Sequence, residues 1–401
     1  MKKHLIAAAV AGAFAVPAMA QVTVGGILEL APYHTGKVTT QATSETVANT
    51  LKNTRTAGAS TWATSVLNVS GSEDLGGGLT ASFLLMTGAG TMPNSNTNAP
   101  DSGIGNRERS LSLTKSGLGT LRYGRFVAAP GPGFHAYTNA GSASLPGSMY
   151  GVSQGHSATA GGAFGHNNFH SNAGNFERQN NLLQLTSVPI NGFTVTVALG
   201  RDALDDSAAN RGGQAKAEYS GLQLVYAAGP LSIGLGGNQR KTEVEAAPAT
   251  PADAAEDPIV VGVAAVPQSS TKGSLNWVGG SYNLGVATIA GAYVAREDKA
   301  TTAAGVTTTA NDISIAGVGV SVPLGAVTLR ANAYSGKDDR GIAATDDMKL
   351  QGHQLSAVYA LSKRTSLIVA TGVNEYKRDG AASTQATRKY EASTLSVMHS
   401  F

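Results

Sequence analysis

The sequence predicts an all-β fold, a transmembrane antiparallel β-barrel of about 16 strands with an apolar exterior and a wet lumen. Three observations support this prediction: short runs that alternate apolar and polar residues, a regular exchange of short turns and long polar segments, and a terminal aromatic residue in mid-strand. Successive side chains of a strand point to opposite faces, so an alternating run has one apolar face. A sheet with one solvated face would show the same pattern, and turn spacing distinguishes the two.

Period-2 alternation is clear in several runs, where polar or small residues separate the apolar ones. Their apolar members are Phe193, Val195, Val197 and Leu199; Leu222, Leu224 and Tyr226; Leu231, Ile233 and Leu235; and Val327, Leu329, Ala331 and Ala333. Residues 313–322 are apolar or small on both faces, so this run does not reveal its orientation. The Ala- and Pro-rich segment 241–270 leaves room for a further strand, and the strand count stays open by two.

Short turns alternate with long polar segments along the chain. Short turns are expected at 72–78, 116–119, 189–192, 228–230, 283–285, 323–326 and 361–364. Long loops are expected at 32–59, 89–106, 127–175, 201–213, 241–270, 297–311, 336–347 and 377–388. Bacterial outer-membrane barrels have short periplasmic turns and long extracellular loops. Lipid offers no partner to a bare sheet edge, so the sheet should close, and about 16 strands leave space for an aqueous channel.

The two chain ends predict secretion of the protein and closure of the barrel. Residues 1–20 combine Lys2 and Lys3, an apolar stretch and a final Ala18-Met19-Ala20, the pattern of a secretory signal peptide. The apolar stretch is too short to cross a bilayer of about 30 Å, which leaves 21–401 as one barrel domain. Phe401 shares a face with Leu395, Val397 and His399. Chain ends are usually frayed, so this one is expected to pair with the first strand.

Four segments resemble the general porins of Gram-negative outer membranes, of the trimeric, 16-stranded type found in Neisseria and related bacteria. Residues 21–28 resemble the first strand and 71–79 the first periplasmic turn. Residues 107–113 with 119–125 resemble the fourth and fifth strands, and 397–401 the terminal signature that the barrel-assembly machinery reads. The resemblance implies a multi-pass protein of the cell outer membrane, and Phe401 as its assembly signal.

The resemblance also implies partners and a third loop. The partners are two further copies in a homotrimer, outer-membrane lipid and lipopolysaccharide, and the Sec and barrel-assembly machineries during biogenesis. The third extracellular loop should fold into the lumen. Two departures stand out: Val66 replaces an arginine that the family often has in its second strand, and 126–176 contains no Asp, Glu, Lys or Arg where the family usually brings acidic residues.

These features predict a general diffusion porin, a water-filled channel for small hydrophilic solutes and ions, and not an enzyme. In such a channel the fixed charges of a constriction bias ion flow. Arg122 lies between Leu121 and Tyr123, so alternation aims it at the lumen. Strict alternation turns Arg125 outward, whereas the family resemblance favours a pore-facing or loop-anchoring side chain. The candidate pore arginines are Arg122, Arg125, Arg330 and Arg240.

The acid-free third loop predicts weak anion selectivity, because the wall arginines meet no carboxylate from it. Four histidines lie in this loop: His135, His156, His166 and His170. Imidazole titrates near pH 6.5, so the loop histidines allow a pH response, although incidental polar residues are the simpler interpretation. No cofactor or metal is expected. The sequence has no cysteine, and no histidine pair has the spacing of a zinc-binding helix.

Alternative functions remain at this point. A substrate-specific channel of the same architecture fits the same pattern, although only 6% of residues are aromatic. An outer-membrane enzyme would need a catalytic constellation, and the G-x-S-x-G match at 151–155 lacks the strand and helix of a nucleophile elbow. A secreted β-sandwich or adhesin would pack its apolar faces inside. A formal net charge of +3 argues against a nucleic-acid partner.

Overall fold

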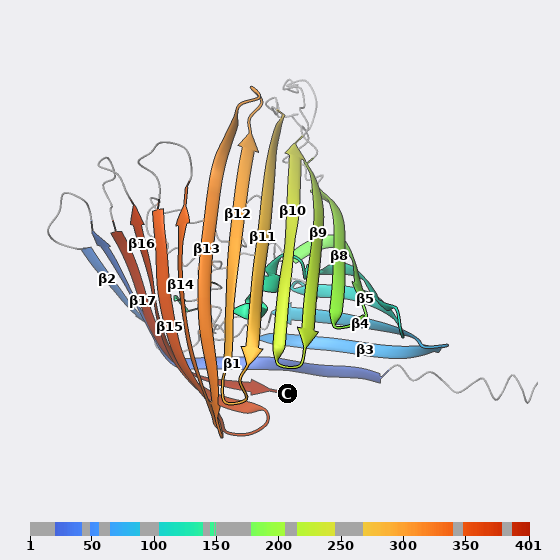
Figure 1. The fold of residues 1–401 in the computed structure, drawn as a ribbon, viewed down its shortest axis with the longest axis horizontal. Helices are drawn as coiled ribbons and strands as arrows, with labels where there is room; N and C mark the ends of the chain where they lie inside the picture. Colours follow the sequence, from blue (N-terminus) through green and yellow to red (C-terminus); the bar gives the residue numbers. More distant parts are fainter. Residues whose placement is uncertain are drawn as a thin grey trace, which may run out of the picture.

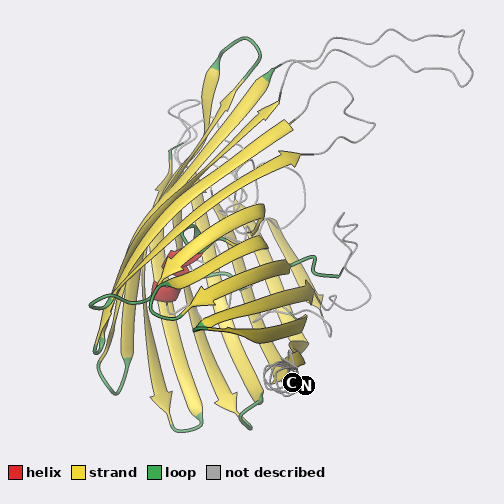
Figure 2. Cartoon of the chain, turned by 90° about the vertical axis from the view of Figure 1, so that its right-hand side faces the viewer, coloured by secondary structure: helices red, strands yellow, loops and turns green. Residues whose placement is uncertain are grey.

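A computed structural model of the chain describes residues 21–41, 49–55, 65–88, 104–138, 145–147, 149, 178–204, 215–244, 268–339, 348–378 and 387–401. These residues form one antiparallel sheet that closes into a barrel, with a short 3₁₀ turn inside it (Figures 1 and 2). The predicted signal peptide, 1–20, lies outside the described residues. In the part of the chain that the structure describes, no helix has the length and apolarity needed to span a membrane.

The barrel wall consists of 17 strand segments. They are β1 (Gln21–Gln41), β2 (Asn49–Arg55), β3 (Val66–Gly76), β4 (Leu79–Gly88), β5 (Glu108–Lys115), β6 (Gly119–Val127), β7 (Arg178–Ser187), β8 (Phe193–Leu204), β9 (Ala215–Ala228), β10 (Leu231–Val244), β11 (Ser269–Asn283), β12 (Thr288–Thr301), β13 (Thr307–Leu324), β14 (Val327–Asp338), β15 (Met348–Ala360), β16 (Thr365–Arg378) and β17 (Thr387–Ser400). β3 pairs with the first part of β1 and β2 with its last part. β2 and β3 therefore occupy one strand position in the wall, and the resulting count of 16 positions confirms the predicted number of about 16 strands.

All seven predicted short turns are confirmed, and all lie at one end of the barrel. The β3–β4 turn places Gly77 and Gly78 at φ 58° and 73°, and the β7–β8 turn places Asn191 and Gly192 at φ 50° and 86°. Glycine and asparagine tolerate this left-handed region best. The sequence pattern therefore located these turns through the residues that their backbones require.

Two of the predicted long loops were partly wrong. β1 continues to Gln41 and β2 occupies 49–55, both inside the predicted loop 32–59. β12 continues to Thr301 and β13 begins at Thr307, so the predicted loop 297–311 is mostly strand. Polar residues in these segments mark strands that extend beyond the apolar band, where both faces tolerate polar side chains. The possible further strand in 241–270 falls largely outside the described residues.

Closure brings the two ends of the described barrel together. β1 pairs with β17 from Ile27↔Ser400 to Gln41↔Thr387. Phe401 N donates to Gly26 O at 3.1 Å, and Gly26 N donates to Phe401 O at 3.0 Å. A Cβ on Gly26 would lie 2.8 Å from Cζ of Phe401, so a glycine is needed where the terminal ring crosses β1. The last strand is tied down as predicted.

The outward face carries the apolar residues of the alternating runs. Leu222, Leu235 and Val278 expose 55%, 49% and 47% of their surface. Exposed large side chains at every second position are the mark of a lipid-facing barrel wall. The single closed sheet, with this face outside, excludes the β-sandwich alternative.

Candidate constriction of the lumen

The chain leaves the wall after β6 and runs inside the barrel. The 3₁₀ turn η1 (Pro132–Tyr137) lies against β10, β11 and β12, and Figure 2 shows it inside the barrel. Residues 145–147 reach β15 and β16. The predicted inward third loop is thus confirmed over 128–138 and at 145–149, apart from Ser148. The rest of the predicted loop 127–175 lies outside the described residues.

Side chains of the wall hold the beginning of this loop. Trp277 Nε1 on β11 donates to Pro130 O at 2.7 Å, and both groups are buried. The hydroxyl groups of Tyr137 and Ser232 are 3.1 Å apart. The rings of Tyr137 and Trp277 pack with their centroids 5.9 Å apart. Buried hydrogen bonds of this kind fix one arrangement, because a broken one leaves a polar group without water.

A second set of contacts holds residues 145–147. Asn374 Oδ1 accepts a hydrogen bond from Gly147 N at 2.6 Å. Gln354 Nε2 donates to Pro146 O at 3.1 Å and to Leu145 O at 3.3 Å. Both wall amides are fully buried. They satisfy backbone groups of the loop that no strand partner serves.

Glycines on the inner wall leave space for the loop. A Cβ on Gly279 would lie 2.7 Å from Cδ2 of Tyr137, and one on Gly234 would lie 2.6 Å from its hydroxyl group. Gly317 faces Met149, and Gly372 faces Pro146 in the same way. The described parts of the loop therefore approach the wall closely at these glycines, where no side chain stands in the way.

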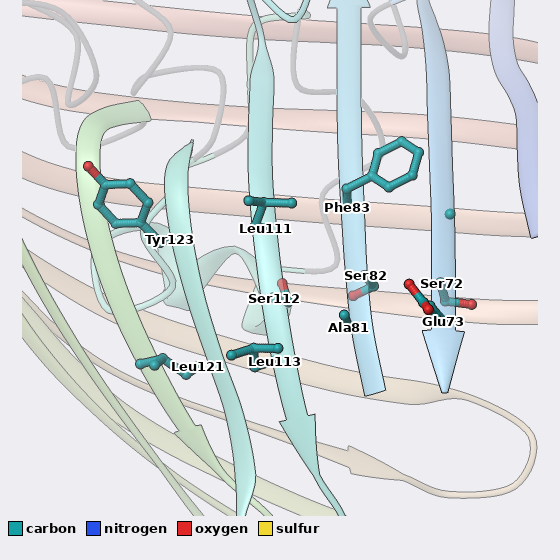
Figure 3. Close-up of a pocket in the computed structure, with 11 residues that line it drawn as sticks. Ser72, Glu73, Ala81, Ser82, Phe83, Leu111, Ser112, Leu113, Leu121 and Tyr123 are labelled. Atoms are coloured by element: carbon teal, nitrogen blue, oxygen red, sulfur yellow. The ribbon is translucent and has the colours of Figure 1, made fainter. Parts of the chain in front are cut away.

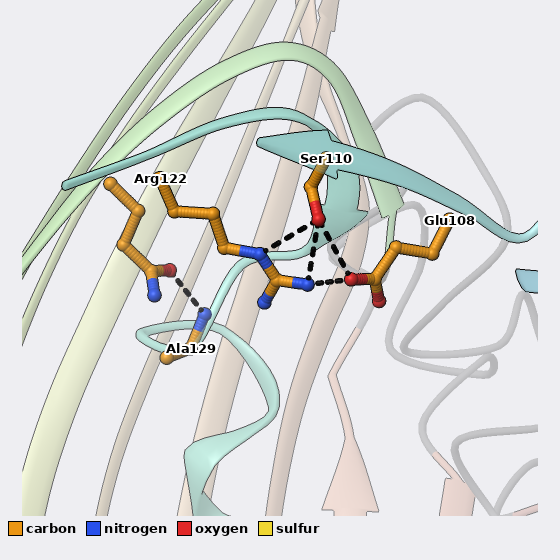
Figure 4. Close-up of polar contacts among 5 residues, drawn as sticks. Glu108, Ser110, Arg122 and Ala129 are labelled. Carbon is orange, nitrogen blue, oxygen red and sulfur yellow. Dashed lines mark hydrogen bonds and ion pairs between the residues drawn. The ribbon is translucent and has the colours of Figure 1, made fainter. Parts of the chain in front are cut away.

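Arg122 sits beside the root of this loop (Figure 4). On the β5–β6 hairpin, Ser112 is opposite Arg122, and the inward alternation continues through Ser110 to Glu108. Arg122 Nη2 forms an ion pair with Glu108. Its Nε and Nη2 donate to Ser110 Oγ at 3.2 Å each, and Ser110 Oγ donates to Glu108 Oε1 at 3.1 Å. The guanidinium carbon lies 4.2 Å from the Phe126 ring centroid.

The loop root and Arg122 share one small region of the wall. Ala129 N donates to Gln184 Oε1 of β7 at 3.0 Å, directly next to the Arg122 side chain (Figure 4). Arg122 also lines an inner groove with Ser82, Thr120 and Gln184. The structure thus places Arg122 on the lumen side, as strict alternation predicts.

The remaining predicted arginines separate into two groups. Arg240 on β10 and Arg330 on β14 occupy inward positions and are half-buried. Arg125 does not face the lumen, so the expectation of a pore-facing Arg125 was wrong. It lies opposite Arg109 and lines an outer groove with Tyr123. The alternation of β6 continues to its end, and Arg125 instead donates to Asn106 O at 3.0 Å and to Asn180 Oδ1 at 2.6 Å.

Inward charges of opposite sign differ in their exposure. Away from the short-turn end of the barrel, among side chains that the structure describes, the inward guanidinium groups are Arg122, Arg240, Arg296 and Arg330, and the inward carboxylates are Glu29, Glu108, Asp298 and Asp338. All four carboxylate residues are buried, with at most 9% of their surface exposed. Arg296 is also buried and pairs with Asp298. The other three arginines are half-buried, so the charge that the lumen water meets is cationic.

Sequence reasoning missed Glu108 and the Arg296–Asp298 pair. The sequence did hold a signal for Glu108. Alternation along β5 turns Leu111 and Leu113 outward and Glu108 inward, and β5 forms a hairpin with β6, the strand of Arg122. Burial of the carboxylates carried no sequence signal, because it depends on what covers the wall.

The loop histidines are only partly placed. His135 lies in η1, and its ring packs edge-on against Phe134 with centroids 4.2 Å apart. His156, His166 and His170 lie outside the described residues, as does the G-x-S-x-G match at 151–155. Within the described ranges no three His, Asp or Glu residues gather in a way that would hold a metal ion.

A closed barrel with an apolar exterior, a polar lumen and a loop across that lumen defines a membrane channel. A family model described as Gram-negative porin matches residues 7–381, and the chain belongs to this family. It is therefore an outer-membrane channel of the general diffusion type. The predicted family, fold and location are confirmed.

Known relatives agree with this assignment. Outer membrane porin protein 32 of Delftia acidovorans is 29% identical over 372 residues, which cover 92% of this chain and 88% of the relative. The anion-selective porin from Comamonas acidovorans is 23% identical with a TM-score of 0.62, covering 95% of this chain and all of the other. OmpT of Vibrio cholerae is 12% identical with a TM-score of 0.57, over 95% and 97% of the two chains. The two structures support the fold.

Proposed function

We propose that this porin is weakly anion-selective and that Arg122 provides the main fixed charge, with Arg240 and Arg330 as smaller contributors. One observation carries the proposal: the inward carboxylates that the structure describes away from the short turns are buried, whereas these three arginines are only half-buried. The third loop adds no carboxylate, since 126–176 has no acidic residue. The similar porin from Comamonas acidovorans is anion-selective, which supports the same preference here.

The expected preference is weak because Arg122 is partly neutralised. Glu108 forms an ion pair with the guanidinium group and offsets part of its charge. The Arg122 side chain is 26% exposed. One full unit charge about 7 Å from a passing ion in water changes its energy by about 0.6 kcal/mol, roughly a threefold bias. Several partly screened charges therefore favour anions without excluding cations.

Reversal potentials in a salt gradient across planar bilayers test this proposal. The protein should show the sign of an anion-preferring pore, and Arg122→Gln should move the potential toward cations because Glu108 then remains alone. Arg125→Gln is the matched control, since Arg125 lies on the outer face, and its potential should stay that of the parent. A cation preference of the unmodified protein would contradict the proposal.

We further propose a homotrimer that associates through the outer face of the short strands. β4, β5 and β6 have only 10, 8 and 9 residues, near the lower limit of about 9–11 for crossing a bilayer. Their outward side chains include Phe83, Leu111, Leu121 and Tyr123, which line one apolar groove (Figure 3). A neighbouring copy would cover this low part of the wall.

The oligomeric state in mild detergent tests the trimer. Leu111→Arg should yield monomers, whereas Leu235→Arg on the outer face of β10 should leave trimers intact. Trimers of both variants, or monomers of the unmodified protein, would argue against this interface.

The processing and assembly roles are also proposals. Residues 1–20 act as a signal peptide, so N-terminal sequencing of the protein from outer membranes should begin at Gln21. Phe401 acts as an assembly signal, and its deletion should lower the amount of folded barrel in the membrane. The backbone hydrogen bonds between Phe401 and Gly26 indicate that part of this effect is structural. Phe401→Tyr keeps the ring and the backbone pairing, so it should retain more folded protein than the deletion.

A further inference from the structure

Three lysines lie side by side on the outer wall. Lys241 on β10 is directly opposite Lys272 on β11, and Lys272 is directly opposite Lys299 on β12. Like charges at directly opposite positions destabilise an antiparallel pair. Adjacent strands are about 4.8 Å apart, so the three ammonium groups stand in a row of about 10 Å. We name these residues the first lysine row.

A second row repeats the arrangement elsewhere on the wall. Lys337 on β14 is directly opposite Lys349 on β15, and Lys349 is directly opposite Lys377 on β16. Two rows of three lysines on separate groups of strands indicate a shared environment. Both rows lie at the ends of the strands away from the short turns, which is the extracellular end of such a barrel.

All six lysines occupy outward positions above the lipid-facing band. Lys272, Lys349 and Lys377 are exposed, and the side chain of Lys241 is 49% exposed. Leu235, Val278 and Tyr293 lie three outward positions closer to the short turns than the first lysine row, and they are also opposite one another. The lysines therefore stand where the hydrocarbon of the outer leaflet gives way to its headgroups.

Neighbouring carboxylates reduce this charge without removing it. In the first row, Lys241 pairs with Glu243 and Lys299 pairs with Glu297, each within its own strand. In the second row, Lys337 pairs with Asp339. Over β8–β12 the outward charged residues whose side chains are described are Arg201, Lys216, Lys241, Lys272 and Lys299 against Glu218, Glu243 and Glu297. The lysines still face one another between strands, and the cations outnumber the carboxylates.

From this register we infer that the two lysine rows bind the phosphate groups of the phosphorylated glycolipid in the outer leaflet. A polyanionic headgroup placed across a row relieves the repulsion between the lysines. Its acyl chains would lie on the apolar residues nearer the short turns. Beside the first row, a groove lined by Leu199, Arg201, Glu218 and Gln239 offers both polar and apolar contacts to the sugar.

Binding of lipid A to the folded full chain in detergent tests the inference. The probes are lipid A with two phosphates, its dephosphorylated form and phosphatidylglycerol, measured by native mass spectrometry. We expect the combined variant Lys241→Gln, Lys272→Gln, Lys299→Gln, Lys337→Gln, Lys349→Gln and Lys377→Gln to bind phosphorylated lipid A at least about tenfold more weakly. The matched variant with arginine at the same positions should bind like the parent.

The other probes decide the occupant. Dephosphorylated lipid A should bind the parent as weakly as phosphorylated lipid A binds the glutamine variant. Equal binding of both forms by the parent, or unchanged binding by the glutamine variant, would overturn the inference. So would phosphatidylglycerol that binds as tightly as lipid A, since the site would then select any anionic lipid. The rows face away from the lumen, so an unchanged conductance shows that the variants still form the barrel, whatever the ion preference.

Discussion

The barrel has a short wall and a tall wall, and the two walls have different roles. The short wall is β4–β7, with strands of 8 to 10 residues, and the tall wall is β8–β16, with strands of 12 to 18 residues (Figure 1). The inner face of the short wall holds Arg122 and its polar neighbours. Much of the inner face of the tall wall is glycine, buried amides and aromatic rings that receive the third loop.

This difference shows how one alternating pattern produces both parts of a constriction. The tall wall fixes the loop through shape, because bare backbone lets the loop approach closely. The short wall contributes charge, because Arg122 is held by Glu108 and Ser110 next to the point where the loop leaves the wall. Substitutions on the tall wall should therefore affect mainly pore size, and those at Arg122 on the short wall should affect ion preference most.

Removing the main anchor on the tall wall should have the largest effect. Trp277→Ala deletes a ring that is 4% exposed and its hydrogen bond to Pro130 O. We expect the free energy of unfolding in urea to fall by about 3–5 kcal/mol and single-channel conductance to rise as the loop loosens. Trp277→Phe keeps most of the packing and should cost about 0.5–1.5 kcal/mol. An unchanged conductance in Trp277→Ala would break the division of roles.

Filling the space under the loop should have an intermediate effect. Gly279→Val places methyl groups against Tyr137, where even a Cβ would be 2.7 Å from the ring. Overpacking of this kind costs about 1–3 kcal/mol, and urea unfolding should show it. Gly280→Val is the matched control: it points outward, its Cβ would be 3.4 Å from the nearest atom, and it should be nearly neutral. Equal losses in both variants would mean that the glycines serve the strands and not the loop.

Neutralising the carboxylate of the short wall should have the smallest effect on energy and a specific effect on ions. Glu108→Gln leaves Arg122 with its full charge in the lumen, so anion preference should increase by about threefold or less, equivalent to about 0.6 kcal/mol. Glu218→Gln removes an exposed partner of Arg201 on the outer tall wall, 3.9 Å away, and should leave reversal potentials unchanged. The same shift in both variants would show that the bias does not arise at Arg122.

Much of the fold was predictable because its signals are local. Alternation gave the faces, glycine or asparagine marked six of the seven turns, and the terminal Phe401 indicated closure. Strand ends were less predictable, as in 297–311, since a strand above the membrane no longer needs an apolar face. At the candidate site, alternation placed Arg122 on the lumen side and turned Arg125 outward, so only the pore-facing alternative that the resemblance offered for Arg125 was wrong.

By itself the sequence determined which residues face lipid and which face the lumen, since that choice follows from the two-residue period of each strand. Only the tertiary structure decided where the third loop meets the wall: Trp277 with Pro130, and Asn374 with Gly147. Register also decided the lysine rows, because residues far apart in sequence become neighbours only when strands pair at one particular offset. Closure of the sheet and entry of the loop set these encounters, and both depend on contacts between distant segments.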